Sequence, residues 1–329
     1  PKSIRHQRAA ELVGKIKWFL TGTPIPNKVS DFTAITTLLG LYRGYVQCNY
    51  KEVMATYVLR RTRMDVAKFN QRLALPKCHI TNEQVHLSPK EIQIYEELFE
   101  KCREKIREYR SLGSIHAHGT EILSMLLKCR QCLISTSLLD KQNTMSSKID
   151  WVIKKISTNP DEKTLVFCHF IHEMNVIREK LVASGANVEV MSGRNSNIER
   201  EKSIEKFKGW DSGVFIIQIE TGGVGLNLQE ATNIIITSPT WNPASELQAI
   251  GRSYRTGQTN EVNVHRLIAA GDCQYPLIDD CILGLQQSKS VLCAGVLEDP
   301  RIIDELPITG SVKSLTVRDV CDCFLNSQN

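Results

Sequence analysis

The stretch from Glu220 to Gln258 reads ETGGVGLNLQEATNIIITSPTWNPASELQAIGRSYRTGQ and decides the fold of the second half of the chain. Its three glycines, at 222, 223 and 225, follow an apolar run, and glycine there permits positive φ angles and close approach of the backbone to a ligand. The β-branched run at 234–237 suits a buried parallel strand. We therefore expect an α/β domain with a ligand-binding loop in this stretch.

A helix is expected directly after that strand. Asn242 is a favourable N-cap, and Pro243 suits the first helical position. On that helix Gln248, Arg252 and Arg255 fall at i, i+4 and i+7, so one face presents an amide and two guanidinium groups. Arginine offers a rigid fork that matches phosphate oxygens, although a solvated helix that merely carries two arginines shows the same pattern.

The whole run resembles the fifth and sixth motifs of the SNF2 family of DNA-dependent ATPases in helicase superfamily 2. The family's Gly-Gly-x-Gly-x-Asn-Leu, Trp-Asn-Pro and Gln-Ala-x-x-Arg-x-x-Arg-x-Gly-Gln segments occur here in order. Residues 21–27, Thr-Gly-Thr-Pro-Ile-Pro-Asn, resemble the third motif, with Pro26 in place of the usual Gln. The chain is also similar to the shorter SNF2-like proteins of large DNA viruses.

The resemblance implies roles for individual residues. Arg252 and Arg255 would act as arginine fingers in ATP hydrolysis, and Gln248 would position them or the attacking water. Nucleotide sensing and coupling would fall to Thr21, Gly22, Thr23, Gly222, Gly223 and Gly225. Double-stranded DNA would be contacted by Ser192, Gly193, Asn227, Trp241, Asn242, Arg60 and Arg61. The implied cofactors are ATP and Mg²⁺, with no metal held by this chain itself.

Three further positions depart from the family pattern. Residues 166–170, Val-Phe-Cys-His-Phe, resemble a fourth motif that often reads Val-Phe-Ser-Gln-Phe, so Cys168 and His169 are changes. Thr240 stands where the family often has a second Trp. We do not expect His169 to be catalytic, because no nucleophile or partner acid lies at a suggestive spacing.

Strands are expected at 165–168, 188–191, 214–217 and 233–237, alternating with helices from residue 148 onward. Ser88-x-x-Glu91 and Ser196-x-x-Glu199 predict capping boxes at two helix starts. Continuous apolar strands in such an alternation indicate a parallel sheet covered on both faces. Ligands bind beyond the carboxyl ends of such strands, and we expect each motif of this half at or just after such an end. The resemblance makes this a RecA-like second helicase lobe. The expected domains are the end of a first lobe (1–80, with a strand at 16–20), a helical protrusion and linker (81–146), the second lobe (147–275) and a C-terminal brace (276–329).

Composition narrows the setting. Residues 1–80 contain 14 Lys and Arg against 4 Asp and Glu, which suits a phosphate backbone or simply solubility. Eleven cysteines without a secretory context favour reduced thiols in the cytosol or nucleus. Cys129-x-x-Cys132 lies in an apolar helical pattern without a second pair at zinc spacing, so we expect buried thiols. No apolar run approaches the ~18 residues that cross a membrane.

No Gly-x-x-x-x-Gly-Lys-Ser/Thr occurs in the sequence, and no Asp-Glu-Ala-His segment. In the family both precede the third motif, so we expect them before Pro1 of a longer protein, and this fragment alone to be inactive. The sequence thus predicts part of a nuclear, double-stranded-DNA translocase that remodels nucleosomes or other protein–DNA complexes. The alternatives are a strand-separating superfamily 2 helicase and a non-catalytic scaffold built on a degenerate motor.

Overall fold

The computed structural model describes residues 4–21, 29–59, 61, 63–70, 74–139, 146–221, 226–284, 286, 321 and 323–325. These residues divide into two compact units. One comprises residues 4–70 with 242–244 and 286, and the other comprises 74–241, 245–284 and 321–325. The motifs that follow strands belong almost entirely to the larger unit.

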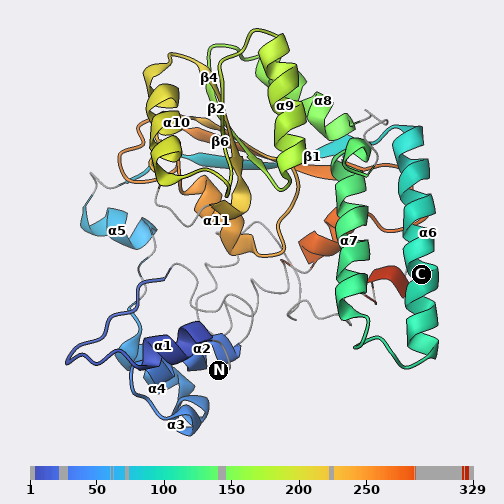
Figure 1. The fold of residues 1–329 in the computed structure, drawn as a ribbon. Helices are drawn as coiled ribbons and strands as arrows, with labels where there is room; N and C mark the ends of the chain where they lie inside the picture. Colours follow the sequence, from blue (N-terminus) through green and yellow to red (C-terminus); the bar gives the residue numbers. More distant parts are fainter. Residues whose placement is uncertain are drawn as a thin grey trace. The chain divides into compact units, whose positions relative to one another are not determined.

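The larger unit is built on a six-stranded sheet in the order β1-β6-β5-β2-β4-β3 (Figure 1). Every neighbouring pair is parallel. The strands are β1 (Cys78–His86), β2 (Lys163–Cys168), β3 (Val188–Met191), β4 (Gly213–Gln218), β5 (Asn233–Ile236) and β6 (Val262–Ala270). The prediction of a parallel α/β sheet is confirmed.

Alternate residues of each strand point to opposite faces of the sheet, and helices pack against the apolar side chains on both faces. Leu165 and Phe167 of β2 join an apolar cluster with α10 (Asn197–Gly209) and α11 (Pro243–Ile250). Val166 and Cys168 join a second cluster with α8 (Ser147–Ser157) and α9 (Ile171–Ala183). Figure 1 shows α10 on one side of the strands and α8 and α9 on the other.

Local signals set the helix starts. Ser196 and Glu199 form the predicted capping box of α10, and Ser146 caps α8 by accepting a hydrogen bond from the Ile149 N–H. The predicted strands at 165–168, 188–191, 214–217 and 233–237 all form, with ends shifted by at most two residues. Residues in these elements obey short-range rules, so sequence alone places them.

Strands β1 and β6 were not predicted. They pair along their whole length, Cys78 with Val262 through His86 with Ala270. The sheet therefore takes one strand from residues 78–86, most of which were assigned to a helical protrusion and linker. The predicted domain limits as a whole stay a prediction.

Helices α6 (Pro89–Ser111) and α7 (Gly119–Ile134) pack together beside the sheet around a third apolar cluster (Figure 1). That core includes the buried Cys129 and Cys132, and burial raises the pKa of the Cys132 thiol to about 12. Helical residues at 278–284 and at 321 and 323–325 contribute Ile278 and Phe324 to the same core. Among the described residues, no three or more His, Cys, Asp or Glu side chains are arranged to hold a metal ion.

One carboxylate joins the start of α6 to the start of α8. Glu91 completes the capping box with Ser88, and its oxygens also accept from the Ser147 N–H at 2.8 Å and the Ser147 hydroxyl at 2.5 Å. Burial opposes ionisation of Glu91, but the hydrogen bonds from Ser147 and Ser88 outweigh it and lower its pKa. The two helix starts are therefore fixed to each other by an ionised group.

The smaller unit consists of α1 (Ile4–Ala10), α2 (Val29–Leu38), α3 (Arg43–Cys48), α4 (Tyr50–Tyr57) and α5 (Arg63–Phe69). Phe32, Val46 and Val53 form its small core. The strand predicted at 16–20 does not form, and Leu20 is 96% exposed. A strand needs a neighbour for its backbone hydrogen bonds, and none of the described residues of 4–70 is extended beside it. No helix in the described parts of the chain has the length and apolar character to cross a membrane.

Candidate functional site

The segment Thr237–Trp241 follows β5 at the carboxyl end of the sheet, and contacts hold each of its five residues. Thr237 donates twice to the Phe167 carbonyl, through its N–H at 3.1 Å and its hydroxyl at 3.2 Å. The backbone N–H and hydroxyl of Thr240 both reach Glu246 Oε1, at 2.8 and 3.1 Å. Thr240 is buried. The departure from a second Trp is thus a buried hydroxyl that helps fix this segment.

Arg130 reaches the segment from α7. Its Nη2 donates to the Pro239 carbonyl at 2.5 Å, and its guanidinium carbon lies 5.6 Å from the centre of the Trp241 ring. Burial lowers the pKa of Arg130, and the carboxylates of Asp279, Glu173, Glu220 and Glu246 oppose that shift. Arginine remains charged in proteins, so a buried cation lies against the Trp241 ring.

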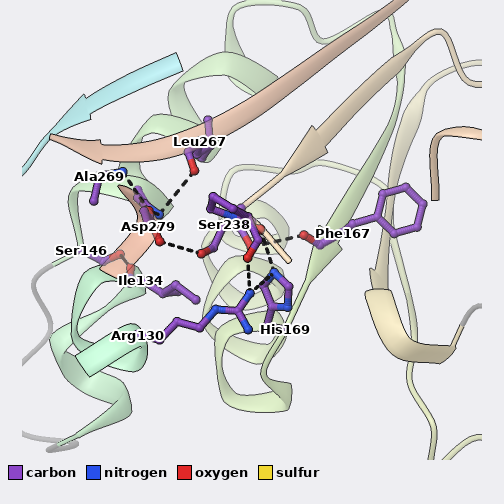
Figure 2. A network of polar contacts seen from close by, with 12 residues as sticks. Arg130, Ile134, Ser146, Phe167, His169, Ser238, Leu267, Ala269 and Asp279 are labelled. Atoms are coloured by element: carbon purple, nitrogen blue, oxygen red, sulfur yellow. Dashed lines mark hydrogen bonds and ion pairs between the residues drawn. The ribbon is translucent and has the colours of Figure 1, made fainter. Parts of the chain in front are cut away.

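His169, the residue directly after β2, is wedged between Arg130 and the segment (Figure 2). Its Nε2 lies 2.8 Å from both Arg130 Nη2 and the Ser238 carbonyl oxygen. One ring nitrogen serves one of these partners at a time, either donating to Ser238 or accepting from Arg130. Burial and the Arg130 charge both hold the pKa of His169 well below its usual value. His169 is therefore held as a neutral ring between Arg130 and the segment, and its expected lack of a catalytic role stays a prediction.

Asp279 fixes the segment from the C-terminal side. Its Oδ1 accepts from the Ser238 hydroxyl at 3.0 Å, and its Oδ2 accepts from the Ala269 N–H at 2.9 Å. Oδ2 also pairs with Lys148 Nζ at 2.5 Å, and the two side chains are 0% and 1% exposed. Figure 2 shows this carboxylate and the Arg130–His169 contact on either side of Ser238. Elements from across the unit therefore converge on the five residues.

Ser192 and Gly193 follow β3 at the same end of the sheet. The Ser192 N–H donates to Asn195 Oδ1 at 2.8 Å, and the Gly193 N–H donates to Gln218 Oε1 at 3.0 Å. Gly193 is exposed. Ser192 is buried, and its hydroxyl also donates to Asn195 Oδ1 at 3.2 Å, so of the two residues only Gly193 is open to a phosphate oxygen.

Residues 251–260, here called the arginine loop, differ from the prediction. α11 ends at Ile250, so Gln248, Arg252 and Arg255 do not share one helical face. The N–H groups of Arg252 and Ser253 bond three residues back, to Ala249 and Ile250. The Arg252 carbonyl accepts from the Leu228 N–H at 2.9 Å instead of from the next helical turn. A tertiary hydrogen bond thus ends the helix where side-chain spacing alone would continue it.

Buried polar groups hold the arginine loop against residues 226–231. The Ser253 hydroxyl donates to the Ala231 carbonyl, and Gln258 Nε2 donates to the Gln229 carbonyl at 2.8 Å. Gln258 Oε1 accepts from the N–H groups of Thr259 and Asn260 at 2.9 and 3.0 Å. Gly257 has a φ of +100°, and a Cβ there would lie 2.7 Å from Gln229 Nε2. The Gly-Gln end of the motif therefore has a structural role that the sequence analysis did not assign.

The two arginines of the loop lie close together. Partial burial lowers the pKa of Arg252, and the positive charge of Arg255 lowers it further. Arg255 is exposed, and its Nη1 donates to the Leu226 carbonyl at 3.3 Å. Gln248 is exposed on α11. A pair of adjacent cations on a fixed backbone is suited to an anion that carries more than one charge.

The arginine loop does not lie at the carboxyl ends of the strands, where every motif of this half was expected. It leads directly into β6, and its partners at 228–231 lead directly into β5. The loop is therefore on the amino-end side of these strands. The helix α11 runs from the end of the Thr237–Trp241 segment to this loop, so the two regions lie at its opposite ends.

The remaining predicted residues are less informative. Asn242 Oδ1 accepts from the Ala244 N–H at 3.1 Å, which is its predicted capping role. Thr21, Arg61 and Asn227 are exposed. Six of the predicted residues lie outside the described part of the chain: Gly22, Thr23, Arg60, Gly222, Gly223 and Gly225.

Known proteins resemble this chain in sequence and in fold. The model of the helicase conserved C-terminal domain matches residues 147–257. The Sulfolobus solfataricus SWI2/SNF2 ATPase core, solved in complex with double-stranded DNA, superposes with a TM-score of 0.55 and 27% identity, covering 93% of this chain and 68% of that one. The relatives of this chain by sequence and its structural neighbours are SNF2-family proteins.

SNF2 relatives by sequence include ATP-dependent and chromatin-remodelling proteins. An uncharacterized ATP-dependent helicase of Mycoplasma pneumoniae is 27% identical over 91% of this chain. The CHD3-type chromatin-remodeling factor CHR7 of Arabidopsis thaliana is 25% identical over 91% of this chain. The chain spans 29% and 27% of the lengths of these two relatives. The chain therefore corresponds to a part of each relative, and that part includes the helicase C-terminal domain.

Proposed function

We propose that the intact protein is an SNF2-type, ATP-dependent translocase on double-stranded DNA that remodels nucleosomes or other protein–DNA complexes in the nucleus. The arginine loop is the observation that carries this proposal. The charge of Arg255 helps to lower the pKa of Arg252, and buried hydrogen bonds of Ser253 and Gln258 fix the backbone that carries both arginines. Preorganised cations of this kind stabilise the charge that develops on a transferring phosphoryl group.

Arg252 and Arg255 would be the arginine fingers, and Gln248 would help to position them or the attacking water. Thr21–Thr23 and the glycines at 222, 223 and 225 would sense and couple the nucleotide state. ATP and Mg²⁺ would be held mainly by a P-loop lobe of the same protein, and Mg²⁺ would neutralise phosphate charge there. This chain alone would then be inactive.

The carboxyl end of the sheet would bind the duplex. Ser192, Gly193, Trp241 and Asn242 would contact DNA there, Asn227 would contact it from the stretch beside the arginine loop, and Arg60 and Arg61 would anchor the backbone. Contacts of this kind read phosphates rather than bases, so binding should be insensitive to sequence and weaken steeply with salt. The solved Sulfolobus relative in complex with double-stranded DNA supports this assignment.

The test is ATP hydrolysis by the full-length protein, with and without double-stranded DNA, for the wild type and Arg255→Ala. We expect DNA to stimulate the wild type and the variant to lose about 10³-fold in rate, the size reported for arginine fingers. Arg178→Ala, an exposed arginine on α9, is the matched control and should retain full activity. Duplex binding without hydrolysis would favour a scaffold, and displacement of one strand would favour a strand-separating helicase.

A further inference from the structure

Two arginines in the larger unit are almost completely buried against an aromatic ring. Arg103 on α6 is 5% exposed and lies 5.5 Å from the Tyr275 ring centre. Arg130 on α7 is 4% exposed and lies 5.6 Å from the Trp241 ring centre. Their burial and stacking are alike, but only Arg130 stacks on a residue of the segment that follows β5.

Arg130 also has polar contacts that Arg103 does not share. Its Nη2 lies 2.5 Å from the Pro239 carbonyl oxygen and 2.8 Å from His169 Nε2. Arg103 pairs instead with Glu100, 3.5 Å away on its own helix. A guanidinium that binds both a carbonyl and the ring two residues later fixes the direction in which that ring points.

We propose that Arg130 is a positioning residue for duplex binding, which acts by orienting Trp241 at the carboxyl end of the sheet. The inference rests on the proposed function, because it assumes that Trp241 contacts DNA. Arg130 itself is buried beneath the segment and does not touch the duplex. The packed helices α6 and α7 thereby contribute to DNA binding without touching the duplex, through the guanidinium of Arg130.

A lysine cannot replace this guanidinium. Its ammonium is a single point of charge without a planar fork, so it cannot cover the Trp241 ring and bind the Pro239 carbonyl in the same geometry. Arg130→Lys should therefore leave Trp241 in place but less firmly oriented. Arg130→Gln keeps a donor for the Pro239 carbonyl and removes the charge over the ring, so it serves as a second variant.

The experiment uses the full-length protein, with a fluorescent duplex of arbitrary sequence as probe. Duplex affinity is measured by anisotropy, and DNA-stimulated ATP hydrolysis is measured against duplex concentration. Arg130→Lys should raise both the dissociation constant and the half-saturating duplex concentration about 10-fold, since a small misplacement of a binding group has effects of this order or larger. Turnover at saturating duplex should change less than about 2-fold, because the arginine loop is intact. Arg103→Lys, the matched control, should change neither quantity.

A double-mutant cycle separates positioning from loss of stability. If Arg130 acts through Trp241, then Arg130→Lys should have almost no further effect in a Trp241→Leu background. Additive effects, or equal losses in Arg130→Lys and Arg103→Lys, would overturn the inference while leaving the proposed function intact. A wild type that neither binds the duplex nor responds to it would overturn both. If Arg130→Lys does not fold, the same cycle with Arg130→Gln decides.

Discussion

The two regions at the ends of α11 are held in place in different ways. The Thr237–Trp241 segment is bound by His169, Arg130 and Asp279, which are 69, 109 and 41 residues from their partners in sequence. The arginine loop is bound mainly to residues 226–231, 22 to 29 residues away, and makes one distant contact, from the Tyr254 hydroxyl to the Pro76 carbonyl at 2.8 Å. Most contacts of the loop therefore come from the stretch that leads into β5, whereas the segment collects its contacts from several distant elements. We expect damage to the segment to spread through the unit, and damage to the loop to stay local.

Removing Asp279 should produce the largest loss of stability. Asp279→Ala leaves Lys148 as a buried charge without its partner and also removes acceptors from Ser238 and Ala269. We expect the free energy of unfolding to fall by about 3–5 kcal/mol, measured by urea titration followed by circular dichroism. Lys180→Ala breaks the exposed pair with Asp150 and should cost less than about 1 kcal/mol. Similar losses in the two variants would contradict the difference drawn between buried and exposed contacts.

A substitution in the arginine loop should cost less. Gln258→Ala removes the donor to the Gln229 carbonyl and the acceptor for two N–H groups of the loop. Leaving such groups unpaired should lower the free energy of unfolding by about 1–3 kcal/mol. ATP hydrolysis should fall more than duplex affinity, because the loop carries Arg252 and Arg255 but not the proposed DNA contacts. A variant that loses duplex affinity and retains hydrolysis would show that the two regions are not separable.

The pH dependence of stability should report on how His169 is held against the Thr237–Trp241 segment. Its pKa is lowered in the folded state, so the unfolded chain binds one more proton as the pH falls below the ordinary value of about 6.5. Stability from this residue is full above that pH and is lost below it, at about 1.4 kcal/mol per pH unit until the folded-state pKa is reached. As the pH falls from 7 to 5, the free energy of unfolding of the wild type should decrease more steeply than that of His169→Gln, by the slope that corresponds to one bound proton. Parallel curves would mean that His169 is not held neutral.

Sequence reasoning succeeded where a local rule decides the outcome. The capping boxes at Ser88 and Ser196 and the apolar strand β4 depend on neighbours a few residues away. The strands β1 and β6 were missed because their polar residues, such as Asn82 and Arg266, interrupt the apolar pattern. Arg266 is nevertheless buried in an ion pair with Glu246, 2.5 Å away. Its partner is on α11, which no local pattern reveals.

The site shows the same limit. The spacing in the sequence grouped Arg252 with Arg255 but wrongly placed both on the helix α11. The helix ends before them, because the Arg252 carbonyl accepts a hydrogen bond from the Leu228 N–H instead. Arg130 was passed over because it occupies an inward-facing position among apolar residues of α7, next to Cys129. A charged residue at such a position is itself a signal, since buried arginines need partners. The partner in this case lies more than one hundred residues further on.

The Glu91 carboxylate bonds to the starts of both α6 and α8, so it fixes one end of α6 while the other end lies far away. The helix has 23 residues and so extends about 35 Å from its fixed end. Because Glu91 ties that end to α8, a tilt of only about 5° at the fulcrum would move the far tip by about 3 Å over such a length. The helix packed along it, α7, would be carried with it. An Ångström-scale shift of Ser88 and Ser147, the two serines bonded to Glu91, would therefore move the far end of α6 far enough to change its contacts.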